Sequence, residues 1–293
     1  MQGLRRDRSD RRSWLRRVAG VGGLLLLGDP SGRAEAAAHR FEPSEFVPME
    51  QIPPGYREQV SEIIRENHFH RKSKSETFPC NGNIYLNLLN HPVLTLGLWH
   101  DLSETSAKLR QTGPNRYQGD DGNGTAAVWE FLIRSARLHV LLCTLQYSGP
   151  RGKQQLDGRV VLVVHTGYFQ KSKGESWIQH DVEAFVKVDS KGWKTVARVA
   201  RPVIEKVLED QIQEAGWFVS LMGRLVEMYP SWACEATLKQ SQVPAEIRQT
   251  FHELVESNKR PNAMAGRPKM IDEVMATTTG GPANASGGGT VTR

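Results

Sequence analysis

The chain has 293 residues, with 38 lysines and arginines against 32 acidic residues, which gives a formal net charge of +6. Residues 1–38 hold eight arginines and four acids, a difference of +4, so only +2 remains for residues 39–293. This small excess excludes a nucleic-acid-binding role, for which a basic domain is expected. Cys80, Cys143 and Cys234 lack the close spacing of a metal site. The sequence does not decide between three free thiols and one disulfide-bonded pair.

Residues 1–38 have the pattern of an export signal. Arg11 and Arg12 precede an apolar run over 18–28, and alanines at 34, 36 and 38 follow at the spacing of a signal-peptidase site. The run is shorter than the about 20 apolar residues that span a bilayer, which favours a cleaved signal. Because "RRSWL" resembles a twin-arginine signal, we expect export to the periplasm or cell envelope. A general secretory signal and an uncleaved anchor are the alternatives.

The remaining chain predicts one main domain with appendages. We expect an N-terminal segment with a short helix over 39–67, the main domain over 68–230, a helical extension over 231–258 and a disordered tail over 259–293. The tail ends in "TTTGGPANASGGGTVTR", which has too few apolar side chains to offset the entropy of ordering.

One helical pattern precedes the main domain, and two more lie near its start. "PPGYREQVSEIIREN" (53–67) predicts a short helix with its valine and isoleucines on one side. The polar stretch 68–78 predicts a first, edge-like strand. Residues 83–103 are apolar at nearly every position, but His91-Pro92 interrupts them, so we expect two short helices that meet at Pro92. A membrane segment is the rival interpretation, which the proline, glycine and histidines disfavour.

From residue 106 the pattern changes to strands and turns. We expect a hairpin over 107–119 and strands over 125–134, 138–147, 159–169 and 177–188. The middle two are apolar on both faces and should be central. The glycine-rich, acidic "GDDGNG" (119–124) lacks the spacing of a phosphate or calcium loop and predicts a turn.

Alternation along the strands predicts which side chains face the core. One face of 125–134 carries Ala127, Trp129, Phe131 and Ile133. Glu130 and Arg134 share the opposite face, where we expect exposure to solvent. In 177–188, one face carries Ile178, His180, Val182, Ala184, Val186 and Val188.

The longest helical pattern comes last. "ARPVIEKVLEDQIQEAGWFVSLMGRLVEMYP" (200–230) has apolar residues at spacings of three and four, and most of its acids lie off that face. A helix over 200–229 would be about 45 Å long, enough to cross a sheet of several strands. The sequence therefore predicts an α+β fold: a curved antiparallel sheet of about seven strands around a long C-terminal helix, with two short helices after the first strand.

This order of elements resembles the helix-grip superfamily, also called SRPBCC, which includes START lipid-transfer domains, the birch-pollen allergen group and polyketide cyclases. The resemblance covers about residues 68–230 and rests on the helix pair over 83–103 and the terminal helix. It implies a cavity between sheet and helix that holds an apolar small molecule or lipid. The N-terminal helix, a further helical segment over 243–258 and the export signal depart from the superfamily. The further segment is a candidate cap for one end of the groove.

The candidate cavity residues come from the strands and the long helix: Trp129, Phe131, His165, His180, Val182, Phe218 and Met222. His165 and His180 fall in neighbouring strands, where they are candidates for an acid/base pair. A buried histidine satisfied by the backbone is the alternative for His180. His68 and His70 share a face but offer only two ligands, so we expect no metal there.

The sequence thus predicts an exported binding protein that carries or sequesters a hydrophobic small molecule or lipid, without catalytic residues, metal or cofactor. Transient membrane contact is an open alternative, and the oligomeric state is undetermined. Two other functions remain: an envelope interaction module whose groove is filled by Trp129, Phe131, Phe185, Trp217 and Phe218, and a cyclase- or hydrolase-like enzyme that uses the two strand histidines.

Overall fold

The computed structural model describes residues 41–268, apart from 123, 149–154, 172–174, 190–208, 210, 211, 214 and 262. In chain order its elements are η1 (Pro43–Glu45), α2 (Pro54–Arg65), β1 (Phe69–Lys72), β2 (Glu76–Pro79), α3 (Gly82–Asn90), α4 (Pro92–Leu102), β3 (Lys108–Gln111), β4 (Arg116–Asp120), β5 (Thr125–Arg134), β6 (Leu138–Ser148), β7 (Gln155–Gln170), β8 (Ser176–Val188), α6 (Pro230–Leu238) and α7 (Ala245–Ser257). A helix described continuously over 215–228 lies between β8 and α6 and is called the crossing helix below.

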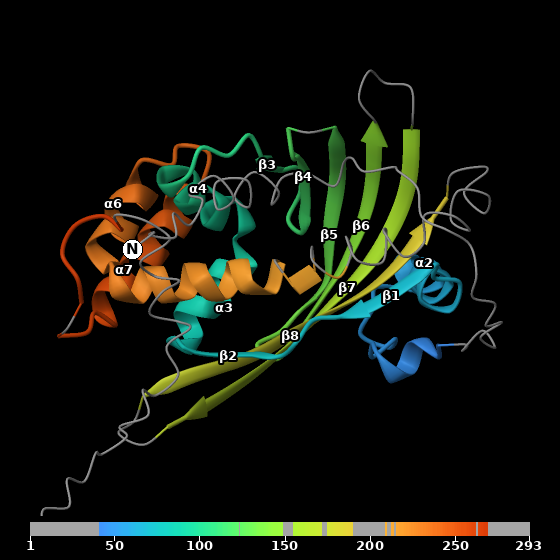
Figure 1. The fold of residues 1–293 in the computed structure, drawn as a ribbon, viewed down its shortest axis with the longest axis horizontal. Helices are drawn as coiled ribbons and strands as arrows, with labels where there is room; N and C mark the ends of the chain where they lie inside the picture. The colour runs from blue at the N-terminus through green and yellow to red at the C-terminus, as the bar shows by residue number, and fades with distance from the viewer. Residues whose placement is uncertain are drawn as a thin grey trace, which may run out of the picture.

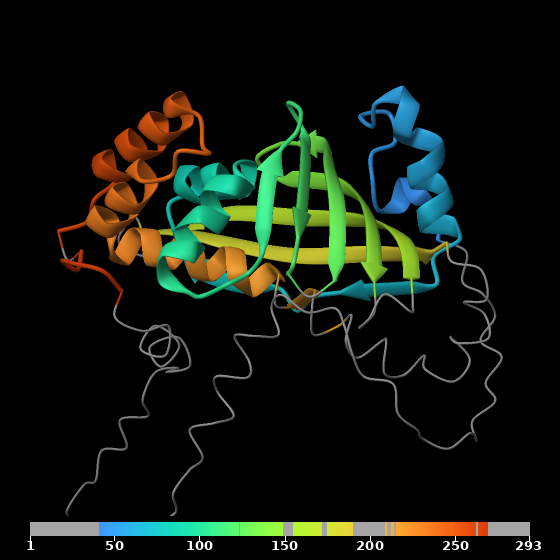
Figure 2. The ribbon, with the colours of Figure 1, turned by 90° about the horizontal axis from the view of Figure 1, so that it is seen from above.

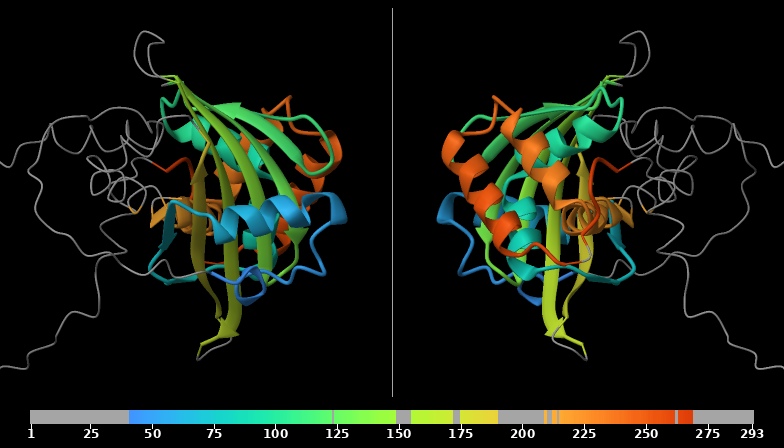
Figure 3. Two further views of the ribbon diagram at one scale, coloured as in Figure 1. Left: turned by 90° about the vertical axis from the view of Figure 1, so that its right-hand side faces the viewer. Right: turned by 90° about the vertical axis from the view of Figure 1, so that its left-hand side faces the viewer.

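The strands form one antiparallel sheet of eight strands, in the order β1-β8-β7-β6-β5-β4-β3, with β2 also paired to β8. The sheet curves strongly (Figures 1 and 3). β6 and β7 lie inside it, as their two apolar faces predict. The predicted edge strand over 68–78 is divided into β1 and β2, which pair with successive parts of β8 at Phe69↔Val186 and Phe78↔Ile178.

Residues paired directly across the ladder share a face of the sheet. Trp129 pairs with Cys143, Cys143 with Val160 and Val160 with Val186, and we call their side the inner face. The neighbouring row, Leu142, Val161 and Phe185, occupies the outer face. Both faces are buried along these strands, which is why the sequence there is apolar at nearly every position.

The crossing helix lies against the inner face, as Figure 1 shows. A Cβ built at Gly216 would contact His180 and Val182 of β8, and one built at Gly223 would contact Cys80 at the end of β2. The contact at Gly216 would be an ordinary 3.6 Å, whereas that at Gly223 would be a tight 3.0 Å, so the glycine at 223 allows the helix to approach the end of β2 closely. The predicted helix spans 200–229; its first residues, 200–208, lie outside the described residues, as do the predicted signal and the end of the predicted tail.

Four further helices gather at one end of the sheet, where α6 and α7 pack beside α3 and α4 (Figure 2). The α3–α4 pair meets at Pro92, as predicted. Asn81 begins α3, because its side-chain oxygen accepts hydrogen bonds from the backbone of Asn83 at 2.8 Å and Ile84 at 3.3 Å. The four helices and the crossing helix share the largest apolar cluster. α6 lies almost wholly in the predicted helical extension over 231–258, of which only 243–258 was predicted as a distinct helical segment.

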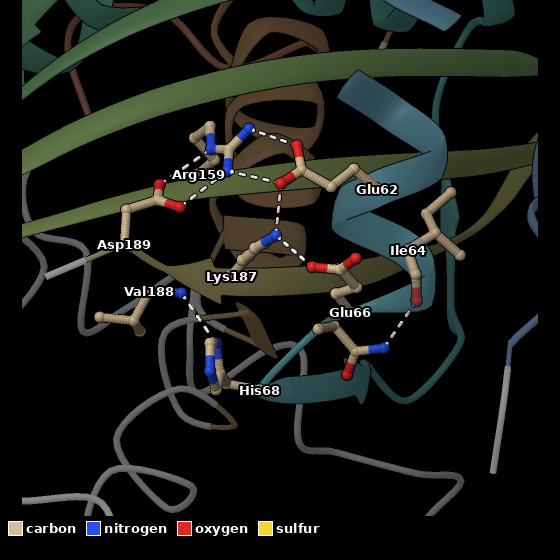
Figure 4. Close-up of polar contacts among 9 residues, drawn as sticks. Glu62, Ile64, Glu66, His68, Arg159, Lys187, Val188 and Asp189 are labelled. Carbon is tan, nitrogen blue, oxygen red and sulfur yellow. Dashed lines mark hydrogen bonds and ion pairs between the residues drawn. The ribbon is translucent and has the colours of Figure 1, made fainter. Parts of the chain in front are cut away.

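The outer face is covered by η1 and α2, which bury Val60, Ile63 and Ile64 against the strands as their spacing predicts. A charged network, drawn in Figure 4, fixes α2 to β7 and β8. Glu62 lies 2.8 Å from Arg159 and 2.5 Å from Lys187, and Lys187 also lies 2.5 Å from Glu66. Arg159 and Lys187 lower the pKa of Glu62 to about 2.

The fold is therefore α+β, with a curved antiparallel sheet gripping a helix, and it has eight strands where about seven were predicted. All three cysteines are free and buried, so the oxidised pair is excluded. Across the described ranges, no helix has the length and hydrophobicity to cross a bilayer, and the apolar stretch 83–103 is the α3–α4 pair.

Candidate ligand-binding cavity

A cavity of about 510 Å³ lies between the inner face of the sheet and the crossing helix. Strands β4 to β8 provide its main wall, and the crossing helix and α4 contribute to the rest. The lining residues are Pro92, Leu96, Ala107, Lys108, Leu109, Tyr117, Gly119, Asp120, Asp121, Thr125, Ala127, Trp129, Phe131, Leu141, Cys143, Leu145, Val160, Leu162, Val182, Ala184, Val186, Ile212, Ala215 and Phe218.

The wall is apolar because of the period-two pattern of β5 to β8. The lining residues that these four strands contribute are aliphatic or aromatic, apart from Thr125 and Cys143. The charged side chains of the lining, Lys108, Asp120 and Asp121, lie on β3, β4 and the turn after it. The turn is the predicted one: Asp121 accepts a hydrogen bond from the Thr125 backbone at 2.9 Å.

A β-bulge changes the faces at the end of β5. Phe131 pairs with Leu141, but Ile133 pairs with Val140, so Leu132 is an extra residue. Ile133 consequently joins the apolar cluster beneath α2 on the outer face, and its predicted place beside Phe131 is wrong.

The same bulge moves Arg134 to the inner face, so its predicted exposure on the face of Glu130 is also wrong. Its guanidinium carbon lies 4.0 Å from the centre of the Phe131 ring, and Nη2 donates to the Tyr117 hydroxyl at 2.9 Å. Both aromatic residues line the cavity. Arg134 Nε is buried without a hydrogen-bond partner in the described part of the chain. Glu130 stays on the outer face, 3.6 Å from Arg116.

Next to Arg134 on the same face lies His139, which is fully buried. Its Nε2 is 3.0 Å from the Asn90 side-chain oxygen, at the end of α3. Burial and, second, the charge of Arg134 lower the pKa of His139 to about 4, so the imidazole is neutral at pH 7. Tyr117, which lines the cavity, thus connects the lining to a polar group that also contains Arg134, His139 and Asn90. These three are not lining residues themselves, and we call the four residues together the polar end.

A second buried polar group lies farther along β7 and β8. His180 Nδ1 is 2.9 Å from the Tyr85 hydroxyl, and His180 Nε2 is 3.4 Å from a carboxylate oxygen of Glu76. Thr166 pairs with His180 across the ladder, and its hydroxyl lies 3.4 Å from that of Tyr85. Side chains, rather than the backbone, hold this histidine.

The structure brings four of the seven predicted cavity residues to the lining: Trp129, Phe131, Val182 and Phe218. Met222 is fully buried in the helical core instead, one turn beyond Phe218. His180 lies two residues before Val182 on the same face of β8, under the crossing helix at Gly216. His165 does not reach the cavity.

The predicted acid/base pair is wrong, because its two histidines lie on opposite faces. His165 pairs with Asp181, whereas His180 pairs with Thr166. His68 and His70 also have separate partners: His68 Nδ1 accepts from the Val188 backbone at 3.0 Å, and His70 Nε2 lies 2.6 Å from Glu183.

Sequence reasoning missed the polar end, because its members are spread over α3, β4, β5 and β6. The bulge at Leu132 has no glycine or proline to mark it. A weak signal was present: Arg134 ends a strand that is otherwise mostly apolar, and His139 is the second residue of the next strand.

No protein-family model matches the sequence, and no curated protein matches it significantly. Among solved structures, the chain is similar to a START superfamily protein from Mycobacterium smegmatis, with 9% identity and a TM-score of 0.30 over 53% of this chain and 97% of that one. A conserved protein from Geobacillus kaustophilus has 16% identity and a TM-score of 0.31, over 50% and 94% of the two chains. Dicamba monooxygenase bound to dicamba has 10% identity and a TM-score of 0.31, over 66% and 60%. Scores this low establish neither a family nor an activity for this chain.

Proposed function

We propose that the protein binds a hydrophobic small molecule or a lipid chain in the cavity between the sheet and the crossing helix. The observation that carries this proposal is the cavity itself: about 510 Å³, walled by the apolar inner faces of five strands. Ligand-binding sites typically have volumes of roughly 300–1,000 Å³, are mostly apolar and hold a few polar groups. Burial of apolar ligand surface would contribute about 25 cal/mol per Å².

The polar end supports a ligand that also carries one hydrogen-bond acceptor. Arg134 donates to Tyr117 through Nη2, while its buried Nε lacks a partner among the described residues. His139 Nδ1 is also buried without a partner among the described residues, but the neutral ring donates to Asn90 through Nε2, so Nδ1 is an acceptor that a donor on the ligand would satisfy. A buried donor without an acceptor costs about 1–3 kcal/mol, which an acceptor on the ligand would offset. We therefore favour an amphipathic ligand over a pure hydrocarbon.

The two alternative functions have less support. A groove filled by its own side chains needs the large aromatic residues to point inward, but Phe185 lies on the outer face against Phe46. The side chains of the other described residues do not fill the cavity, which keeps its volume of about 510 Å³. An enzyme using the two strand histidines needs them to converge, and His165 and His180 point to opposite sides of the sheet.

Export remains part of the proposal, and it rests on the sequence alone. If the "RRSWL" stretch is a twin-arginine signal, replacing Arg11 and Arg12 together by lysine should leave the protein in the cytoplasm of its host. Secretion of the double variant at the normal level would contradict this route.

The binding proposal is tested by a matched pair of substitutions on neighbouring residues of β5. Ala127 lines the cavity, and Ala126 is exposed on the other face. A neutral fluorescent apolar probe is titrated into the wild type, Ala127→Phe and Ala126→Phe. Because the new ring occupies cavity volume, we expect Ala127→Phe to weaken probe binding by roughly tenfold or more, about 1.4 kcal/mol. Ala126→Phe should bind like the wild type.

Two results would contradict the proposal: no saturable binding to the wild type, or equal affinities for the two phenylalanine variants. Circular dichroism of both variants checks that the strand is intact. A loss of binding in both variants with intact folds would place the probe outside the cavity.

A further inference from the structure

Three side chains with metal-binding atoms converge between α6 and α7, away from the cavity. Cys234 lies on α6 and is 5% exposed, while His252 and Glu256 lie on α7. One ligand atom from each, the thiol sulfur, an imidazole nitrogen and a carboxylate oxygen, lies within 4.8 Å of the other two. The sulfur is 3.7 Å from Glu256 Oε1.

The helices produce this convergence. His252 and Glu256 are four residues apart, so they lie on one face of α7, one turn from each other. That face packs against α6, where the sulfur of Cys234 also lies 4.0 Å from the backbone oxygen of His252. The linear sequence hides the set, because Cys234 is 18 residues from His252.

We propose that Cys234, His252 and Glu256 bind a divalent transition-metal ion of borderline softness, with Zn²⁺ as the best match. A thiolate, an imidazole and a carboxylate are the side chains that bind Zn²⁺, whereas Mg²⁺ and Ca²⁺ prefer oxygen ligands alone. When the sulfur–metal bond forms, the thiol proton leaves to solvent.

The present spacing is close to that of a bound site. Zn–S bonds of about 2.3 Å and Zn–N bonds of about 2.0–2.1 Å place the ligand atoms of a tetrahedral ion roughly 3.5 Å apart. Side-chain rotations that move atoms by about 1 Å are therefore sufficient. Glu256 is exposed, which gives the ion a path from solvent and leaves the fourth position to water. Lys259, 3.8 Å from the Glu256 carboxylate, is the competing cation.

Metal binding here would join α6 to α7. Together these helices cover the end of the fold where Asn258 accepts a hydrogen bond from Asn81, the residue that begins α3, at 2.7 Å. Because an ion bound only by the folded chain stabilises it, zinc should raise the unfolding temperature. The site is independent of the proposed ligand cavity.

The test is a Co²⁺ titration of the full chain without a histidine tag, followed by absorption. Co²⁺ substitutes for Zn²⁺ and gives a thiolate-to-cobalt charge-transfer band when sulfur binds it. We expect the band in the wild type, its absence in Cys234→Ser, and roughly tenfold or weaker affinity in His252→Gln. Cys143→Ser, a change of another buried cysteine, should keep the band, as should His100→Gln, a change of an exposed histidine.

A missing band in the wild type would overturn the proposal, and so would a band of equal strength in Cys234→Ser. Glu256→Gln is the variant that separates loss of binding from loss of folding. Because Glu256 is exposed, its replacement should leave the circular dichroism spectrum unchanged while it weakens Co²⁺ binding. Unchanged affinity in that variant would remove Glu256 from the site and contradict the three-ligand set. Zinc should raise the unfolding temperature of the wild type but not that of Cys234→Ser.

Discussion

Replacing Glu62 by glutamine removes the charge on which the outer-face network depends. Glu62 receives hydrogen bonds from Arg159 at 2.8 and 3.2 Å and from Lys187 at 2.5 Å. These contacts lower the pKa of Glu62 from 4.5 to about 2. Glutamine keeps the shape of the side chain, so the substitution tests the charge rather than the packing of α2.

The size of the effect follows from this pKa. A difference between 4.5 and about 2 sets an upper bound of ~3.4 kcal/mol at about 1.36 kcal/mol per pH unit. The Glu62 side chain is 36% exposed, and solvent screening reduces the contribution to roughly 1–2 kcal/mol. We expect Glu62→Gln to lower the free energy of unfolding by that amount at pH 7.

The pH dependence has a definite sign. A carboxyl group whose pKa is depressed by folding stabilises the fold above its unfolded pKa, and it loses this contribution as the pH falls toward the folded value. The difference between wild type and Glu62→Gln should therefore be full at pH 7, shrink below about pH 4.5 and vanish only below about pH 2. Urea denaturation at pH 7 and at pH 3 measures it.

Glu58, an exposed glutamate of the same helix, supplies the matched control, and Glu58→Gln should change the stability by less than about 0.5 kcal/mol. If Glu62→Gln lost the same free energy at pH 7 and pH 3, the effect would come from side-chain shape, and the electrostatic argument would be refuted. No loss at pH 7 would refute it as well.

Two further predictions concern the cavity wall and the polar end. Gly119→Ala should destabilise the fold by about 1–3 kcal/mol in urea denaturation, because its Cβ would lie 2.4 Å from the Lys108 carbonyl oxygen. Gly167→Ala, whose nearest contact would be 3.8 Å, should be tolerated, and equal losses in the two variants would contradict the strand spacing. Arg134→Met should raise the pKa of His139 above its value of about 4 but keep it below 6.5, because burial remains the larger cause. An NMR titration of the imidazole showing a lower or unchanged pKa would exclude the close approach of the two side chains.

Much of the fold could be predicted because the spacing of apolar residues and the positions of prolines and turn residues are local signals. The His91-Pro92 break separated α3 from α4, and the doubly apolar runs identified the two inner strands β6 and β7. The division of the edge strand was not predictable in this way. Both β1 and β2 pair with β8, and the shift between them depends on that partner.

The candidate site was predictable only where successive side chains of a strand alternate regularly between the two faces of the sheet. Trp129 and Phe131 reached the lining because they lie before the bulge at Leu132, and the same rule misplaced Ile133 and Arg134 beyond it. The opposite faces of His165 and His180 depend on the register of β7 and β8, which a single sequence does not specify.

The most direct test of the account is to locate a bound apolar ligand by NMR of isoleucine, leucine and valine methyl groups. Alternation supplies internal controls, because Leu141, Val160 and Leu162 line the cavity while their neighbours Val140, Val161 and Val163 lie on the outer face. Addition of a medium-chain alkyl ligand with a polar head should shift the first set at saturation and leave the second set nearly unchanged. Absence of saturable shifts, or shifts confined to the outer-face methyl groups, would contradict the claim that this cavity binds apolar molecules.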